Sequence, residues 1–119
     1  MKYFATSEFC CQHCGALPEG GMNPVLLEKL DQLRELAGRP IIVTSGYRCP
    51  AHNAEVGGVP DSQHVQGNAA DIYCDGLTVD ELADLAVQVG MDGIGRYYDQ
   101  GFVHCDVRSN GTEPNGYQW

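Results

Sequence analysis

Two histidines and one aspartate, placed far apart along the chain, set the strongest constraint on how this sequence can fold. His64 and Asp71 are separated by six residues with Gly67 between them, and His104 lies in the later segment Phe102–Arg108. Two imidazoles and one carboxylate are a ligand set typical of catalytic zinc, which keeps its fourth coordination position open for water. Because zinc lowers the pKa of a bound water to about 7, such a site makes a nucleophile at neutral pH. We therefore expect the fold to bring these three side chains together.

Capping residues and hydrophobic periodicity predict an α+β domain. A helix is expected from Asn23, an N-cap followed by proline, to Gly38, and a second helix from the capping box at Thr78 to Gly90. Apolar or alternating segments predict strands at 40–44, 69–74, 93–98 and 102–108, with 46–68 as a long ordered loop. This order predicts a small antiparallel sheet with the helices packed on one of its faces.

The alternation of side chains along a strand gives the expected sheet one polar face. In the last strand, Phe102, His104 and Asp106 share a face, and the residues between them are apolar. In the earlier strand, Asp71 and Tyr73 likewise alternate with apolar neighbours. Because the helices should cover the apolar face, the candidate ligands are expected on the face that the helices leave open.

Length and charge limit how many domains the chain can form and which classes of partner it can bind. The chain of 119 residues is expected to be a single domain, with a Cys-rich irregular lead at 1–22 and a polar tail at 109–119. Its 16 acidic and 7 basic residues give a formal net charge of −9, which argues against nucleic acid or an anionic membrane surface as a partner. No apolar run is long enough for a membrane span, and the first residues lack the apolar core of a signal peptide.

Five sequence blocks in a fixed order resemble a known family. They are Ser-Gly-Tyr-Arg at 45–48, His52-Asn53, Val56-Gly57-Gly58, Ser62-x-His64-x-x-Gly67-x-Ala69-x-Asp71, and the late His104. They resemble the zinc D-Ala-D-Ala carboxypeptidases and peptidoglycan endopeptidases, whose zinc-site fold also occurs in lysostaphin-type peptidases and in the hedgehog signalling domain. The likeness covers about residues 4–108. It implies that His64, Asp71 and His104 are the zinc ligands.

The resemblance also implies an activity: hydrolysis of a peptide bond at or near D-alanine in peptidoglycan stem peptides, by a carboxypeptidase or an endopeptidase. Arg48 would hold a substrate carboxylate or the scissile carbonyl, because its planar guanidinium donates a fork of two hydrogen bonds. Ser62 would bind substrate or orient a ligand, with capping of the loop as the alternative. Tyr73 and Phe102 are expected to line the substrate groove, because they share the face of the ligands.

The proton acceptor is the least determined part of the expected site. Relatives with a His-x-His pattern carry a histidine two positions before the last ligand, where this chain has Phe102. Asp106 lies two positions after His104 on the same strand face and is the predicted general base, with Asp99 in the hairpin turn as the second candidate. The alternative for Asp106 is a structural role, as an acceptor for Arg108 or for the free ring N–H of a ligand.

A group of cysteines and histidines in the lead and the loop allows two interpretations. Its members are Cys10, Cys11, Cys14, Cys49, His13 and His52. One interpretation is a disulfide that ties the lead to the loop just after Arg48, which an extracellular site of action favours. The other is a second, structural zinc, since the Cys-x2-Cys spacing is that of a zinc knuckle. Cys74 and Cys105 fall on apolar strand faces and are expected to be buried thiols.

Partners and location follow from the resemblance. The expected partner is a peptidoglycan peptide, the protein is expected to be a monomer, and its place of action is the cell wall, extracellular or periplasmic. Without a signal peptide, such chemistry is compatible with a phage lysis enzyme. The alternative function is a non-catalytic, zinc-stabilised module that binds peptidoglycan or a protein, because Phe102 replaces a histidine of the family pattern. Turnover of muropeptides separates the two functions.

Overall fold

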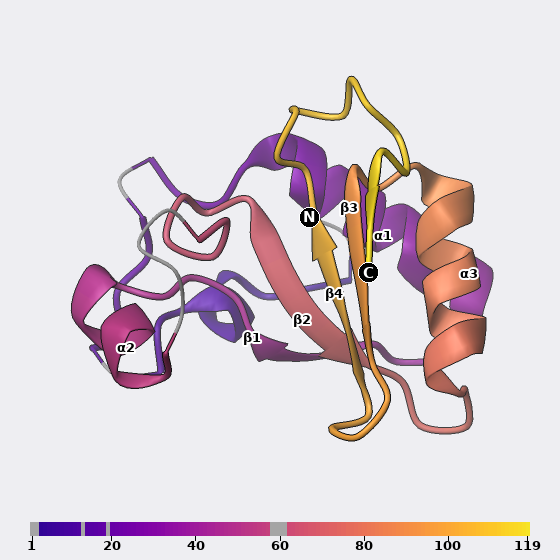
Figure 1. Ribbon diagram of the computed structural model, residues 1–119, viewed down its shortest axis with the longest axis horizontal. Coiled ribbons are helices and arrows are strands. Elements are labelled where there is room, and N and C mark those ends of the chain that lie inside the picture. The colour runs from indigo at the N-terminus through magenta and orange to yellow at the C-terminus, as the bar shows by residue number, and fades with distance from the viewer. Residues whose placement is uncertain (1–2, 13, 19, 58–61) are drawn as a thin grey trace.

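Three α-helices, one 3-10 helix and five strands form the described part of the chain, residues 3–12, 14–18, 20–57 and 62–119 of a computed structural model. In chain order the elements are η1 (Thr6–Phe9), α1 (Pro24–Ala37), β1 (Ile42–Ser45), α2 (Pro50–Glu55), β2 (Ala69–Tyr73), α3 (Val79–Val89), β3 (Gly93–Tyr97), β4 (Phe102–Asp106) and β5 (Tyr117–Gln118) (Figure 1). The α+β class predicted from the sequence is confirmed. His13 and Gly58, which belong to the sequence motifs, lie outside the described residues.

The two long helices begin and end at the residues that the sequence predicted. The Asn23 side chain accepts a hydrogen bond of 2.9 Å from the backbone N–H of Val25, and Gly38 ends α1 in the left-handed region with φ of 67°. Thr78 and Glu81 form a reciprocal capping box at the start of α3, and Gly90 ends it with φ of 81°. Side-chain caps satisfy N–H groups that a helix start leaves without a partner, so these boundaries are set locally.

The sheet is mixed, which corrects the expectation of a purely antiparallel one. Its strand order is β1-β2-β4-β3-β5, and every neighbouring pair is antiparallel except β3 with β5. The tail can return along β3 because the buried carboxylate of Asp92 accepts backbone N–H bonds from three tail residues, Ser109, Gly111 and Glu113. This long-range anchor has no local sequence pattern.

The core lies between one face of the sheet and the helices α1 and α3 (Figure 1). Leu26, Leu30 and Leu33 of α1 are fully buried, and they pack in one cluster with the inward-facing residues of the strands, among them Ile72 and Val103. The prediction that Cys74 and Cys105 are buried thiols is confirmed: they are 4% and 0% exposed. The opposite face of the sheet, away from α1 and α3, carries the polar side chains.

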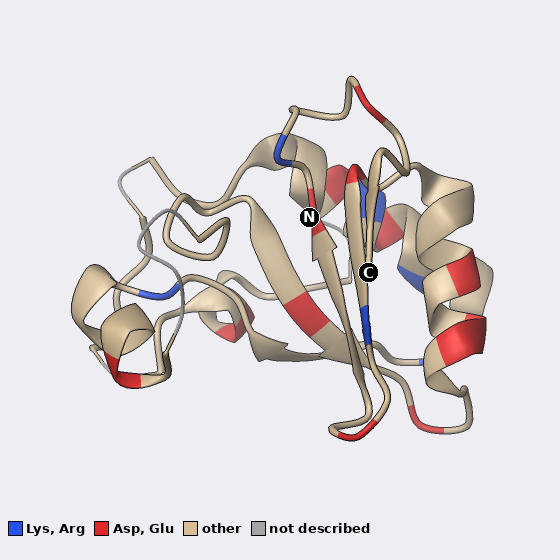
Figure 2. Cartoon of the chain, in the orientation of Figure 1, with Lys and Arg blue, Asp and Glu red and all other residues tan. Residues whose placement is uncertain are grey.

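The loop between β1 and β2 contains a short helix that the sequence analysis missed. Helix α2 covers Pro50–Glu55, and the Cys49 sulfur accepts a hydrogen bond from the His52 backbone N–H at its start. Acidic residues lie on α3, in the turns and in the middle of β2, as Figure 2 shows. Among the described residues, no helix has the length and apolar character needed to cross a membrane.

Candidate metal centre

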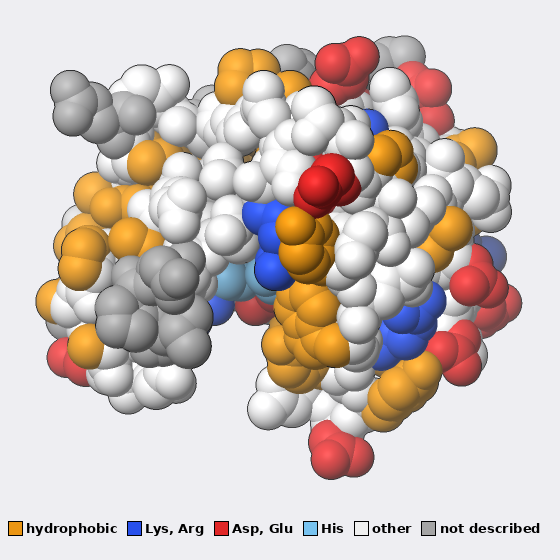
Figure 3. Space-filling model, turned by 45° about the horizontal axis from the view of Figure 1, so that its top comes forward, with side chains coloured by type: hydrophobic (Ala, Val, Ile, Leu, Met, Phe, Trp, Pro, Cys, Tyr) orange, Lys and Arg blue, Asp and Glu red, His pale blue; other side chains and the backbone are white. Residues whose placement is uncertain are grey.

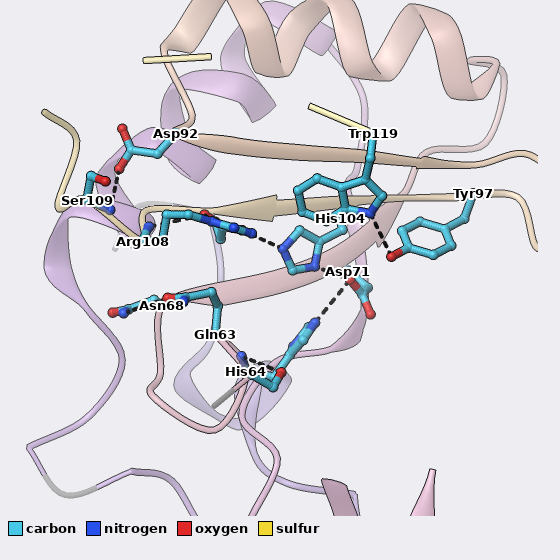
Figure 4. Close-up of polar contacts among 12 residues, drawn as sticks. Gln63, His64, Asn68, Asp71, Asp92, Tyr97, His104, Arg108, Ser109 and Trp119 are labelled. Atoms are coloured by element: carbon cyan, nitrogen blue, oxygen red, sulfur yellow. Dashed lines mark hydrogen bonds and ion pairs between the residues drawn. The ribbon is translucent and has the colours of Figure 1, made fainter. Parts of the chain in front are cut away.

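His64, Asp71 and His104 meet on the open face of the sheet. One ligand-capable atom from each of the three lies within 4.8 Å of the others, and the residues are 1%, 9% and 8% exposed. Asp71 and His104 are direct cross-strand partners in β2 and β4, so the sheet fixes their separation. His64 reaches them from the loop that precedes β2, as Figure 4 shows.

A bulge in β1 orients His64. The register of the pairing between β1 and β2 shifts between Val43 and Ser45, and this shift places Ser45 opposite Asp71. Gly46 is the next residue along the chain. The Gly46 carbonyl accepts a hydrogen bond of 2.8 Å from His64 Nδ1. A side chain at Gly46 would place its Cβ 2.7 Å from the Cα of Phe9, so glycine is needed for this close approach. The bond leaves Nε2 of His64 facing Asp71 Oδ1 at 3.2 Å.

His104 is oriented through its other ring nitrogen. Its Nε2 lies 2.7 Å from Asp106 Oδ2, and its Nδ1 faces Asp71 Oδ1 at 3.1 Å. An ionised carboxylate only accepts hydrogen bonds, so Nε2 must carry the proton that it donates to Asp106. In the neutral His104 ring, Nδ1 then presents a lone pair. In His64, the N–H of Nδ1 donates to the Gly46 carbonyl, so Nε2 presents the lone pair.

Three lone-pair donors therefore converge where a cation would stabilise them. The pKa values show that the three side chains interact strongly. Burial alone would raise the pKa of Asp71, but the hydrogen bonds from His104 and His64 outweigh it and lower the pKa to about 2. The pKa of His104 is raised, because its bonds with Asp106 and Asp71 outweigh the lowering effect of burial. Two imidazole nitrogens and one carboxylate oxygen fit the donor preference of zinc.

Asp106, the predicted general base, lies behind the His104 ring and not among the three converging side chains. The residue is fully buried, and its carboxylate binds His104 Nε2 on the side of the ring away from Asp71. Its oxygens also accept bonds from Nε and Nη2 of Arg108 at 3.0 and 2.7 Å. Burial raises the pKa of Asp106, but these donors outweigh it and hold the pKa well below its usual range. Asp106 thus makes both contacts of its alternative, structural role.

A cavity of about 590 Å³ opens beside the three converging side chains. Figure 3 shows histidine side chains at the bottom of a hollow, next to basic and hydrophobic side chains. Three of the predicted substrate-binding residues line the cavity: Arg48, Ser62 and Phe102. Among the described residues that line it, Asp71 carries the only carboxylate. Asp99, the second candidate for the base, is exposed in the β3–β4 turn and does not line this cavity.

Arg48 and Ser62 differ in how their side chains are engaged. The Nη1 of Arg48 donates to Asn53 Oδ1 at 3.3 Å, and its Nε is buried with no hydrogen-bond partner among the described residues. The Arg48 guanidinium therefore keeps donor capacity at the cavity wall. The Ser62 Oγ accepts a bond of 3.2 Å from the His64 backbone N–H, which is the loop-capping alternative.

Tyr73 is not where the parity argument placed it. It lines a different cavity, of about 370 Å³, together with Gly76 and Leu77. Although Tyr73 shares the face of Asp71, it pairs with Ile42 at the far end of β2. Strand parity gives the face of a side chain but not its position along the strand, so Tyr73 lies apart from the cavity that Arg48 and Phe102 line.

Two further aromatic residues, Tyr97 and Trp119, lie beside the candidate metal centre. The Trp119 indole N–H donates to the Tyr97 hydroxyl at 2.9 Å, and its ring lies 5.0 Å from that of His104 (Figure 4). The Tyr97 ring stacks on Phe102, with centroids 4.5 Å apart. Trp119 also lines a second cavity, of about 280 Å³, with Arg48 and both histidines. The alternate spacing of Tyr117 and Trp119 was the one sequence signal for a strand at this position.

Comparison with known proteins agrees with this geometry. The family model described as peptidase M15 matches residues 2–106. The peptidoglycan L,D-endopeptidases MepK of Escherichia coli K12, Escherichia coli O157:H7 and Shigella flexneri are each 30% identical to the chain over 93 residues. These matches cover 72% of this chain and 51% of each relative, so the chain spans about half the length of the curated relatives it matches.

Proposed function

Because this chain belongs to the peptidase M15 family, we propose that it hydrolyses a peptide bond in bacterial peptidoglycan stem peptides with one zinc ion bound by His64, Asp71 and His104. The observation that carries this proposal is the convergence of three suitable ligand atoms within 4.8 Å. A bound zinc would act as a Lewis acid, polarising the scissile carbonyl and lowering the pKa of a water molecule to about 7. The site of action would be the cell wall, where such peptides occur.

The surrounding residues prepare the ligands for this task. Gly46 holds His64 through its carbonyl, and Asp106 holds His104 through its carboxylate, at 2.8 and 2.7 Å. Such partners fix the tautomer and the ring orientation of metal-binding histidines. Arg108, which binds the Asp106 carboxylate, fixes that residue in turn. We therefore assign Asp106 to positioning and not to proton transfer.

Arg48 is the residue best suited to bind the substrate at the reacting carbonyl. It lines both cavities that border the candidate metal centre, and its Nε donor is buried without a hydrogen-bond partner in the described part of the chain. A guanidinium can stabilise the negative charge that develops on the carbonyl oxygen when water attacks. Asn53 limits the movement of the guanidinium through its bond to Nη1.

The cavities favour an endopeptidase over a carboxypeptidase. One, of about 590 Å³, continues towards His52 and Val56, and the other, of about 280 Å³, continues towards Arg108 and Trp119. Both cavities share His64 and His104 in their lining. We infer that a substrate chain can run through both adjoining cavities past the candidate metal centre, as internal cleavage requires. The relatives named above, which are endopeptidases, support the same choice.

Incubation of the purified, zinc-loaded chain with defined muropeptides, followed by mass spectrometry, tests the proposal. We expect two fragments from a cut inside the stem, loss of this product with a chelator, and recovery after zinc is returned. His64→Ala should abolish the product, whereas the matched control Asp99→Asn, at an exposed position outside the cavity, should retain it. Release of terminal D-alanine alone would contradict internal cleavage. Binding without any product would favour the non-catalytic module.

A further inference from the structure

A second convergence of ligand atoms lies outside the site described above. The sulfurs of Cys11, Cys14 and Cys49 all lie within 4.8 Å of one another, and no disulfide joins them in the described part of the chain. We propose that these three cysteines bind a structural zinc ion that holds the N-terminal lead against the loop carrying Arg48. This proposal concerns an ion separate from the one at His64, and it does not depend on the reaction proposed above.

The number of converging sulfurs favours a metal over a disulfide. A disulfide would join two of the cysteines and leave the third sulfur close by with no role. A tetrahedral zinc with Zn–S distances of about 2.3 Å brings its sulfur ligands to roughly 3.8 Å from one another, which small movements from the present spacing can reach. The described residues thus supply three of the four ligands of a closed structural site, from Cys11 and Cys14 in the lead and Cys49 in the loop.

Backbone N–H groups directed at the sulfurs give an independent indication. The N–H of Cys49 donates to the Cys11 sulfur at 3.4 Å, and the N–H of His52 donates to the Cys49 sulfur at 3.4 Å. These bonds hold two of the three sulfurs in place at the cluster, so their positions are set by the backbone.

Backbone hydrogen bonds made by Cys11 and Gly15 bring Cys11 and Cys14 to the same side. The N–H of Gly15 donates to the Cys11 carbonyl at 2.7 Å, and Gly15 adopts φ of 72°, in the left-handed region. The N–H of Cys11 in turn donates to the carbonyl of Ala16 at 2.8 Å. The backbone folds back on itself at this point, so the Cys-x2-Cys pair is arranged before any ion binds. A preformed site costs less conformational entropy on binding.

The location of the cluster suggests what the ion does. Cys49 directly follows Arg48, and it also precedes α2, whose Asn53 binds the Arg48 guanidinium. An ion at Cys49 would therefore restrain both ends of the contact that fixes Arg48. Removal of the ion at the cysteines should weaken substrate binding but leave the arrangement of His64, Asp71 and His104 unchanged.

Zinc stoichiometry by elemental mass spectrometry on the full chain tests the proposal. Wild type should bind two zinc ions per chain, and Cys14→Ser should bind one, because Cys14 is exposed and its replacement leaves the core intact. The matched control Cys10→Ser, next to the cluster but not part of it, should bind two. His64→Ala should bind one zinc, the one at the cysteines.

Cobalt substitution distinguishes the two sites without any activity measurement. Sulfur-to-cobalt charge-transfer absorption in the near ultraviolet should be present in wild type, Cys10→Ser and His64→Ala, and absent from Cys14→Ser. A titration of the denatured, unreduced protein should find six thiols. Four thiols would indicate a disulfide, and six thiols with only one zinc would indicate a cluster that binds no metal. Either result, or two zinc ions in Cys14→Ser, would overturn the proposal, whatever the outcome with muropeptides.

Discussion

Gly93→Ala probes the support beneath His104 more directly than any change to a ligand. Gly93 lies on β3 opposite Asp106 of β4, and an added Cβ would lie 2.5 Å from both Cγ and Oδ1 of that carboxylate. Non-bonded carbon atoms approach no closer than about 3.5 Å without repulsion. The carboxylate must therefore retreat by roughly 1 Å, or the two central strands must separate.

The cost of that retreat follows from the contacts it breaks. Asp106 accepts bonds of 2.7 Å from His104 Nε2 and of 2.7 Å from Arg108 Nη2, and it is fully buried. Hydrogen bonds to a charged group contribute about 1.5–3 kcal/mol each, and loss of a partner in a buried ion pair costs about 3–5 kcal/mol. We expect Gly93→Ala to lower the free energy of unfolding by about 3–5 kcal/mol. Because the free energy of unfolding of a small domain is about 5–15 kcal/mol in total, the variant should still fold but be much less stable.

Urea unfolding at pH 7 with saturating zinc, followed by circular dichroism, measures this loss. The matched control is Gly95→Ala, two positions along the same strand, where the added Cβ would meet the ring of Trp119 at 2.6 Å. Trp119 as a residue is 47% exposed, so its ring can move aside and the control should lose about 1 kcal/mol or less. Zinc affinity at the histidine site should fall about 10- to 100-fold in Gly93→Ala. A loss below about 1 kcal/mol, or one equal to that of the control, would refute the reasoning.

Further predictions concern Asp106, Trp119 and Thr78. Asp106→Asn should lower zinc affinity about 10- to 100-fold in a competition titration with a chelator, whereas a general base would leave that affinity unchanged. Trp119→Phe removes the hydrogen bond to Tyr97 and should lower kcat/KM about threefold to tenfold, measured with the muropeptide. Thr78→Ala should lower the free energy of unfolding by about 1 kcal/mol in thermal or urea melts, through loss of the α3 cap. In the zinc-free protein, the lowered pKa of Asp106 implies stabilisation that is complete above the unfolded value of 3.8 and is lost as pH falls towards the folded value. An acid titration by circular dichroism should therefore be shallower in Asp106→Asn, and an unchanged titration would contradict this assignment.

The elements that the sequence predicted correctly are those with local causes. Asn23, Gly38 and Thr78 set helix ends through bonds to their own neighbours, so a pattern of a few residues was sufficient. Alternation along β2 and β4 likewise gave the correct face for Asp71 and His104, because strand geometry alone determines it.

The remaining features depend on contacts between distant segments. The parallel strand β5 requires the Asp92 carboxylate to bind the backbone N–H groups of the tail, and no local sequence pattern predicts that contact. The role of Asp106 depends on which nitrogen of His104 faces Asp71, a choice that only the assembled site makes. Tyr73 shows the same limit, because parity cannot tell which end of a strand lies beside a cavity.

The ligand-bearing residues differ in how freely they can move. Asp71 and His104 are neighbours on adjoining inner strands, so their spacing changes only if the sheet itself shears. His64, by contrast, extends from a connecting segment and is tied down by the Gly46 carbonyl. Binding and release of an ion should therefore depend on movement of the segment that carries His64, which requires the bond to Gly46 to break. Asp71 and His104 keep their spacing during that movement.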